Sequence, residues 1–243
     1  MGINPSRSFG QAARTYAAAR PTYPQQLLAK ALRGVTGPIV DCGAGTGLLT
    51  TVLADLGLEV IAVDPDPAML NELAATAPHV RRLIGTAESM PIPAGSIGAV
   101  VFGQAWHWVD PDQASHEADR VLTPGGSLVL VWNIRDDATE WVGQLTNIMG
   151  LSPAERLIRD GGPTVTQPFQ QRAVFTQEWV RTLTPDALRG LVRSRSPYIT
   201  ANPEQQRDVD HAVDQLIATH PSLAGKTELH LPYRTYAFVY QRD

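Results

Sequence analysis

The fold is decided by residues 38–50, Pro38-Ile-Val-Asp-Cys-Gly-Ala-Gly-Thr-Gly-Leu-Leu-Thr50. A short apolar run ends in Asp41, and glycines then occupy the alternate positions Gly43, Gly45 and Gly47. Glycine is favoured where the backbone takes a positive φ or approaches a ligand closely, and a helical spacing of apolar residues follows the third glycine. The stretch therefore predicts a strand, a tight turn and a helix whose N-terminal N–H groups point at whatever lies over the turn.

The glycine spacing separates two classes of ligand. The dinucleotide fingerprint G-x-G-x-x-G places a diphosphate on the helix N-terminus. Gly43 and Gly45 match this fingerprint, but its third glycine would fall at Leu48. The observed pattern, D-x-G-x-G-x-G, resembles motif I of the class I S-adenosylmethionine (SAM) dependent methyltransferases. In that family the turn passes beneath the amino-acid end of the cofactor. Taken by itself, the motif could also be a tight turn that binds no ligand.

Strand and helix patterns alternate along the first half of the chain, which predicts a doubly wound, mostly parallel α/β sheet with helices on both faces. The predicted strands are residues 38–42, 59–63, 80–84, 99–103 and 127–132, and the predicted helices between them are 47–56, 67–76 and 111–121. Later patterns predict helices at 141–151, from 184 and at 205–219, and strands at 175–183 and 228–240. The two late strands suit an antiparallel pair at a sheet edge. The resemblance implies seven strands, with an antiparallel C-terminal strand.

The length of 243 residues suits one domain. The segment Phe9-x3-Ala-x2-Tyr16-x3-Arg20-Pro21-x-Tyr23-Pro24 resembles the N-terminal lid of many small-molecule methyltransferases, and an ordinary helical cap on the sheet is the alternative. We expect a single SAM-dependent methyltransferase domain that comprises an N-terminal helical lid (1–37), a cofactor-binding core (38–132) and a region of substrate-side helices and C-terminal strands (133–243).

A second acid supports a nucleoside site. Asp64 ends the second predicted strand, 23 residues after Asp41. In nucleoside-binding α/β folds, an acid about 20 residues beyond the glycine turn accepts the ribose hydroxyls. Asp64 is therefore the predicted ribose ligand. Asp66 is instead expected to be the N-cap of the next helix, with Pro67 at the first helical position.

The segment Trp106-His107-Trp108 follows the fourth predicted strand, at the edge where ligands bind in doubly wound sheets. It resembles the corresponding motif of methyltransferases related to trans-aconitate methyltransferase. His107 is the catalytic candidate, as a general base or as a group that only orients the acceptor. Tyr16, Trp106 and Trp108 are candidates for an aromatic face against the cationic sulfonium. A core role for the tryptophans, with His107 as their hydrogen-bonded neighbour, is the alternative.

The resemblance extends these predictions along the loops at the same edge. Ala87 and Glu88 are expected near the adenine, although Glu88 could also be a solvated charge. Together, the predicted cofactor-binding residues are Tyr16, Arg20, Asp41, Gly43, Ala44, Gly45, Asp64, Pro65, Met69, Ala87, Glu88, Gln104 and Ala105. No metal is expected, because His116-Glu117-x-x-Arg120 lacks the second histidine of the zinc motif.

Four arginines cluster late in an acidic chain: Arg181, Arg189, Arg193 and Arg195. A solvated helix face is one interpretation of such a run. The other is a site for an acidic group of the substrate.

The composition limits the setting and the partners. Hydrophobic residues make up 43% of the chain, which is enough for a buried core. The net charge of −4 argues against nucleic acid and anionic membranes as partners. The single cysteine, Cys42, favours a reducing cytoplasm, and neither a signal peptide nor a membrane-spanning run is recognised. We expect a cytoplasmic monomer or homodimer that acts on a small molecule.

The expected activity is methyl transfer from SAM to a small-molecule acceptor by in-line displacement, as O-, carboxyl-, C- or N-methylation. Residues 103–106, Gly-Gln-Ala-Trp, differ from the N-P-P-[YF] motif of the branch that methylates nucleic-acid bases and protein amides. Two alternatives stay open. The first is a SAM-binding regulator or partner protein without catalysis. The second is a nicotinamide-dependent oxidoreductase, which Leu48 in place of the third fingerprint glycine disfavours.

Overall fold

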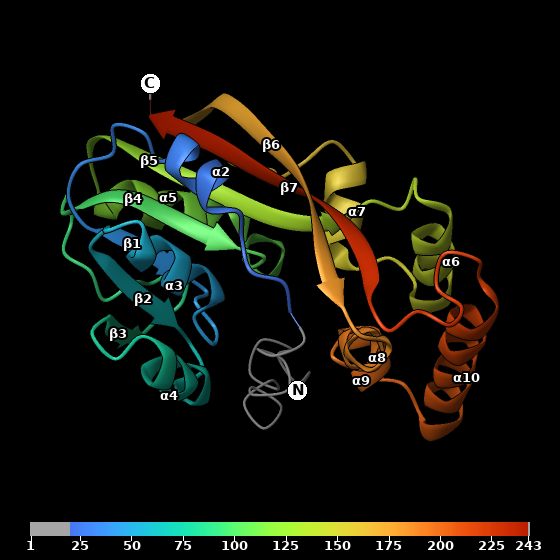
Figure 1. Ribbon diagram of the computed structural model, residues 1–243. Helices are drawn as coiled ribbons and strands as arrows, with labels where there is room; N and C mark the ends of the chain where they lie inside the picture. Colours follow the sequence, from blue (N-terminus) through green and yellow to red (C-terminus); the bar gives the residue numbers. More distant parts are fainter. Residues whose placement is uncertain (1–19, 243) are drawn as a thin grey trace.

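The computed structural model describes residues 20–242, which form a seven-stranded sheet in the order β3-β2-β1-β4-β5-β7-β6 (Figure 1). Neighbouring strands from β3 to β5 are parallel, and β7 is antiparallel to both β5 and β6. The strands are β1 (Ile39–Cys42), β2 (Val60–Asp64), β3 (Arg81–Ile84), β4 (Ile97–Gly103), β5 (Leu122–Arg135), β6 (Phe169–Leu183) and β7 (Leu229–Arg242). The predicted α/β class and the doubly wound, mostly parallel sheet are confirmed.

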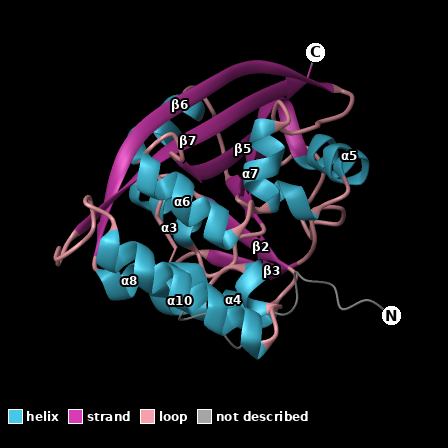
Figure 2. Ribbon diagram, turned by 90° about the vertical axis from the view of Figure 1, so that its right-hand side faces the viewer, coloured by secondary structure: helices cyan, strands magenta, loops and turns pink. Residues whose placement is uncertain are grey.

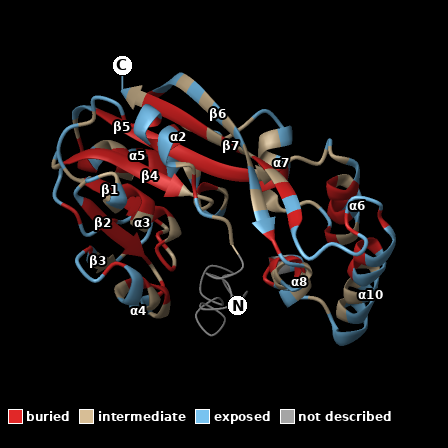
Figure 3. Cartoon of the chain, viewed as in Figure 1, coloured by how far each residue is buried: buried red, intermediate tan, exposed pale blue. Residues whose placement is uncertain are grey.

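Helices cover both faces of the sheet, so β1 and β2 are buried along their whole length (Figure 3). Such continuous apolar strands are typical of parallel sheets covered on both sides. One face packs against α2 (Gln25–Ala31), α3 (Leu48–Asp55) and α4 (Pro67–Thr76). The other packs against the 3-10 helix η3 (Trp106–Trp108), α5 (Pro111–Val121) and α7 (Pro153–Arg159).

A third apolar cluster lies beyond the sheet proper, where β6 and β7 extend past the other strands (Figures 1 and 2). It joins the ends of these two strands to α6 (Glu140–Met149), α8 (Pro185–Arg193) and α10 (Pro203–Thr219). The short helix α9 (Ser196–Ile199) connects α8 to α10. The long strands therefore hold a helical group beside the carboxyl ends of the parallel strands.

The C-terminal strands form the predicted antiparallel pair at a sheet edge, with β7 between β5 and β6 and β6 outermost. The connection from β6 to β7 contains α8, α9 and α10. β6 begins at Phe169, six residues before the predicted start. Its early residues are polar and carry no clear alternation, so only pairing with β7 identifies them as a strand.

The end of β5 matters for the site. The strand continues three residues beyond the predicted limit, to Arg135, because Asn133 and Arg135 pair with Thr235 and Tyr233 of β7. This extension carries Asn133 and Arg135 past the edge of the parallel strands. No helix in the described part of the chain is long and apolar enough to span a bilayer.

Candidate functional site

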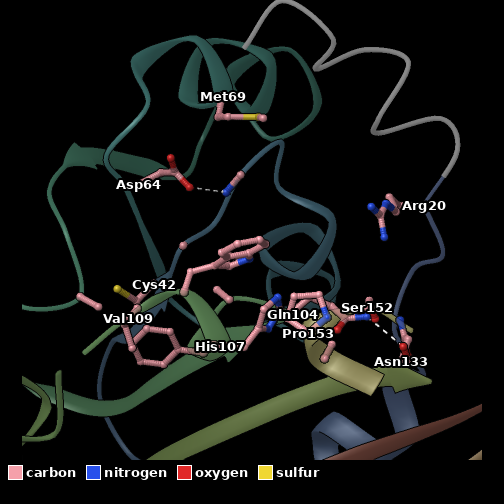
Figure 4. A pocket seen from close by; sticks show the side chains of 18 of the residues that line it. Arg20, Cys42, Asp64, Met69, Gln104, His107, Val109, Asn133, Ser152 and Pro153 are labelled. Atoms are coloured by element: carbon pink, nitrogen blue, oxygen red, sulfur yellow. Dashed lines mark hydrogen bonds between the residues drawn. The ribbon is translucent and has the colours of Figure 1, made fainter. Parts of the chain in front are cut away.

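Two adjoining pockets lie at the carboxyl ends of β1, β2, β4 and β5. The larger one, shown in Figure 4, extends from Asp64 and Met69, past His107, to Arg135 and Glu155. The smaller one lies around Asp41 and Thr46. Seven residues line both: Arg20, Pro21, Gly43, Gly45, Gly103, Gln104 and Asn133. The shared walls make this one candidate site with two compartments.

The glycine turn forms the common wall of the two pockets. Gly43 and Gly45 have φ angles of 73° and 55°, in the left-handed region that favours glycine. A Cβ at Gly43 would come within 2.6 Å of the Cβ of Ala105, whereas a Cβ at Gly45 would meet nothing within 4 Å. Gly43 therefore permits close packing onto the loop after β4. Gly45 keeps the turn in shape and leaves the backbone open to the pockets.

Asp64 ties the turn to the end of β2. One carboxylate oxygen accepts the Gly45 N–H at 2.8 Å, and the other accepts the Asp66 N–H at 2.9 Å. The carboxylate lines the larger pocket although Asp64 is only 6% exposed, and burial raises its pKa. Asp66 caps α4 by accepting the Ala68 N–H, with Pro67 at the first position, so that prediction is confirmed.

The smaller pocket contains polar atoms that lack partners. Gln104 has a φ of 57°, a sparsely populated conformation for a residue other than glycine. Its Nε2 donates to the carbonyl of Asn133 at 2.9 Å, while its Oε1 is buried without a hydrogen bond among the described residues. The hydroxyl of Thr46 is likewise buried and unbonded within that part of the chain. An amino-acid group, which carries both donors and acceptors, would satisfy these atoms. The residues present thus fit the methionine end of SAM.

Asp41 lies beneath this compartment. It is 1% exposed and accepts a hydrogen bond from the Thr50 hydroxyl of α3 at 2.6 Å. Burial raises its pKa to about 7, and Asp64 adds to this effect while the Thr50 bonds oppose it. The folded protein therefore retains a proton that the unfolded chain releases between about pH 4 and pH 7.

This raised pKa predicts how stability depends on pH. The contribution of Asp41 to the free energy of unfolding falls as pH rises from about 4 to about 7, because the folded state then binds more protons than the unfolded state. Asp41→Asn removes that loss and still accepts the Thr50 bond. Urea unfolding of the ligand-free protein is expected to show the variant gaining stability relative to wild type between pH 5 and pH 8. A difference that is constant with pH would contradict the assignment.

The Trp106-His107-Trp108 segment forms η3, and its two tryptophans lie in different surroundings. Trp106 is buried in the core, and its indole N–H donates to the carbonyl of Thr164 at 2.9 Å. Trp108 is 43% exposed and lines the larger pocket. Trp106 does not line either pocket, so the core interpretation holds for Trp106 and not for Trp108.

His107 lies in the larger pocket beside Trp108, with ring centroids 4.8 Å apart. The Nε1–H of Trp132 donates to its Nδ1 at 3.4 Å. Burial, with a further contribution from Arg20, lowers the pKa of His107 to about 4. The ring is therefore neutral at physiological pH. Because Nδ1 accepts a bond, the proton belongs on Nε2, and the geometry favours a hydrogen-bond donor over a general base.

The far end of the larger pocket holds a buried ion-pair group. Arg135 from β5 and Arg195 from the α8–α9 connection each bond one oxygen of Glu155, at 2.6 and 2.9 Å. Glu155 belongs to the first turn of α7, where it forms a capping box with Ser152. Burial would raise the pKa of Glu155, but the two guanidinium groups outweigh this effect and lower it to about 2.

The late arginines of the sequence divide between surface and pocket. Arg189 pairs with Asp186 and Asp214, and Arg193 pairs with Asp210, all on the outside of the helical group. Arg195 alone of the four lines the larger pocket. The solvated-face interpretation therefore applies to Arg189 and Arg193, and the substrate-site interpretation can apply only to Arg195.

The predicted cofactor-binding residues that the structure describes all line one or both pockets. Asp41 and Ala44 line the smaller one, Arg20, Gly43, Gly45 and Gln104 line both, and Asp64, Pro65, Met69, Ala87, Glu88 and Ala105 line the larger one. Glu88 also accepts the N–H of Asp110, the N-cap of α5, at 3.2 Å, so it connects its loop to the start of that helix. Tyr16 lies outside the described residues.

Several lining residues were not predicted from the sequence. Thr46 falls within the glycine motif. Only the structure shows that its hydroxyl is buried beside the pocket without a hydrogen bond to a described residue. Asn133 and Arg135 follow the fifth predicted strand, at the edge where ligands bind, so their position could have identified them. For Glu155, the pattern Ser152-Pro-Ala-Glu155 signals only the start of a helix.

The known proteins that this chain resembles are methyltransferases. The methyltransferase domain family matches residues 40–130. An uncharacterized methyltransferase of Mycobacterium tuberculosis is 45% identical over 95% of this chain and 93% of its own length. An uncharacterized methyltransferase-like protein of Schizosaccharomyces pombe is 31% identical, with 98% and 96% covered. A structure from Anaeromyxobacter dehalogenans, provisionally assigned as a type II methyltransferase, shares the fold with a TM-score of 0.69 at 24% identity, over 92% of this chain and 97% of that one.

Proposed function

Because the chain belongs to the class I SAM-dependent methyltransferases, we propose that it methylates a small-molecule acceptor held in the larger pocket. The observation that carries this proposal is the continuity of that pocket. It extends from Asp64, where the family cofactor would place its ribose, past His107 to the buried arginines. One cavity can therefore hold a donor and an acceptor at the same time, which methyl transfer requires.

In this proposal, Asp64 accepts the ribose hydroxyls of SAM, and Met69, Ala87 and Glu88 lie beside its adenine. The amino-acid end occupies the compartment of Asp41 and Thr46. Its charged groups face the Oε1 of Gln104 and the guanidinium of Arg20, which line both pockets.

When bound, SAM supplies a methyl carbon on a sulfonium, and its displacement leaves a neutral thioether that needs no proton. The protein then contributes mainly by alignment, with nucleophile and methyl carbon about 3 Å apart. Trp108 is placed to offer an aromatic face to the cationic sulfur. His107 donates a hydrogen bond from Nε2 that orients the acceptor.

The state of His107 can be measured without the acceptor. The indole N–H at Nδ1 and the pKa of about 4 predict a neutral ring protonated on Nε2 from pH 5 to pH 8. Nitrogen-15 NMR of histidine-labelled protein, with His107→Gln to assign the signals, reports the tautomer directly. A ring protonated on Nδ1, or a titration near pH 6.5, would instead support the general-base role.

Two experiments test the proposed function against its alternatives. Calorimetry is expected to show binding of S-adenosylhomocysteine (SAH) and none of NADH or NADPH; the reverse result would support an oxidoreductase. Radiolabel from methyl-labelled SAM is expected to pass to at least one member of a library of small acids, phenols and amines. SAH binding without any transfer across such a library would favour the non-catalytic SAM-binding protein.

A further inference from the structure

The pocket end lined by Arg135, Glu155 and Arg195 is here called the arginine end. Its two guanidinium groups carry more positive charge than its single carboxylate neutralises. The two arginines are 4% and 7% exposed, and both line the pocket. Two guanidinium groups share the single carboxylate of Glu155. Burying a charge without its own partner is costly, so the second guanidinium calls for an explanation.

Glu155 cannot balance this excess, because its carboxylate carries one negative charge and pairs with two guanidinium groups. One oxygen accepts from Arg135, and the other accepts from Arg195 and from both the backbone N–H and the hydroxyl of Ser152. A carboxylate offers about four acceptor positions. Four hydrogen bonds already reach this carboxylate, three of them on one oxygen.

The arginines, by contrast, keep donors in reserve. Each guanidinium has about five N–H groups. Arg195 uses its Nη2 toward Glu155, and Arg135 uses its Nη2 toward Glu155 and Thr146. The Nε of Arg135 is buried and makes no hydrogen bond to any described residue. Both arginines line the pocket, so an acceptor group bound there would meet guanidinium N–H groups that no described residue uses.

Charge is also separated along the site. The acids Asp64 and Glu88 line the end assigned to the cofactor. Ser152, which begins the turn that holds Glu155, lies well away from Asp64 in the pocket view (Figure 4). Arg20 lies close enough to Arg195 to help lower its pKa, after burial and Arg135. A cationic donor and an anionic acceptor would each meet the charge that attracts it.

We propose that the acceptor carries an oxyanion group, a carboxylate or a phosphate, which Arg135 and Arg195 bind at the arginine end. This inference rests on the proposed function and names the class of its substrate. Planar guanidinium groups suit both oxyanions because their N–H pairs match the oxygen spacing. The bound anion supplies the missing negative charge and anchors the acceptor.

The test is calorimetry on the full chain saturated with SAH. The probes are tricarballylate, succinate and inorganic phosphate, with tricarballylamide as the neutral match for the first. At least one anion is expected to bind, and the amide at least about tenfold more weakly, because it lacks the charge that the arginines recognise. Tighter binding of the acids identifies a carboxylate site, and tighter binding of phosphate identifies a phosphate site. Failure of every anion, or equal binding of the amide, would overturn the proposal.

Variants then locate the bound anion. Arg195→Met is expected to weaken anion binding at least about tenfold and to leave the SAH affinity unchanged. Arg195→Lys keeps the charge and is expected to retain part of the anion affinity, so a folding defect in the first variant does not decide the outcome. Arg193→Met, next to it on the outer surface, is the matched control and should bind as wild type. Unchanged anion affinity in both Arg195 variants would contradict the assignment.

The two proposals fail in different ways. If SAH itself does not bind, the proposed function is wrong. If SAH binds and no anion does, only the inference about the acceptor is wrong.

Discussion

Asp64→Asn is expected to weaken SAH binding by about 100-fold or more. Each Asp64 oxygen accepts a backbone N–H, from Gly45 and from Asp66. The NH2 group of asparagine cannot accept a bond, so one of these N–H groups would face another donor. The variant also loses the charge that strengthens bonds to the ribose hydroxyls, each worth about 1.5–3 kcal/mol for a charged partner. Calorimetry with SAH measures the loss.

The matched control is Asp66→Asn. Asp66 has the same size and charge, lies two residues away, and caps α4 through a bond that asparagine also makes. Its SAH affinity is expected to stay within about twofold of wild type, because asparagine is as good an N-cap as aspartate. Equal losses in both variants would mean that the whole β2–α4 loop had been disturbed and would remove the support for a ribose contact at Asp64.

Glu155→Ala is expected to reduce the free energy of unfolding by about 3–5 kcal/mol. Its removal leaves Arg135 and Arg195 facing each other, buried and without an acid. It also removes the capping box of α7. Urea unfolding measures the effect. Glu178→Ala is the control, because Glu178 pairs with Arg234 at the surface, where an ion pair contributes about 1 kcal/mol or less.

The same group predicts an acid-sensitive contribution to stability. The pKa of Glu155 is lowered to about 2 from an ordinary value of 4.5. The stability that it provides is therefore complete above about pH 4.5 and is lost as pH falls toward 2. Wild type is expected to lose more stability than Glu155→Ala over this interval. Parallel pH profiles for the two proteins would argue against a charged Glu155 in the folded state.

The cofactor half of the site could be predicted because its signals are local. The glycine turn and Asp64 lie at strand ends that short patterns identify, and the topology of a parallel sheet brings such ends together. The fold class followed from the same alternation of strands and helices. The position of β7 within the sheet could not be predicted in this way, because strand order depends on long-range pairing that no short pattern encodes.

The acceptor half could not be assembled from the sequence in the same way. Arg135, Glu155 and Arg195 come from three separate segments, and their ion pairs form only when α7 and the α8–α9 connection meet the end of β5. The position of His107 after β4 left two roles open, a general base and a group that orients the acceptor. The contact that bears on this choice comes from the indole of Trp132, 25 residues away, and no short pattern reveals it.

We propose that donor and acceptor share one pocket, with the donor anchored at Asp64. A crystal structure of the full chain with SAH tests this most directly. We expect the ribose hydroxyls within about 3.2 Å of the Asp64 carboxylate, the amino-acid end beside Thr46 and Gln104, and the sulfur facing the space between His107 and Arg195. Ribose oxygens held by another carboxylate, or a sulfur that faces away from that space, would contradict this arrangement of donor and acceptor.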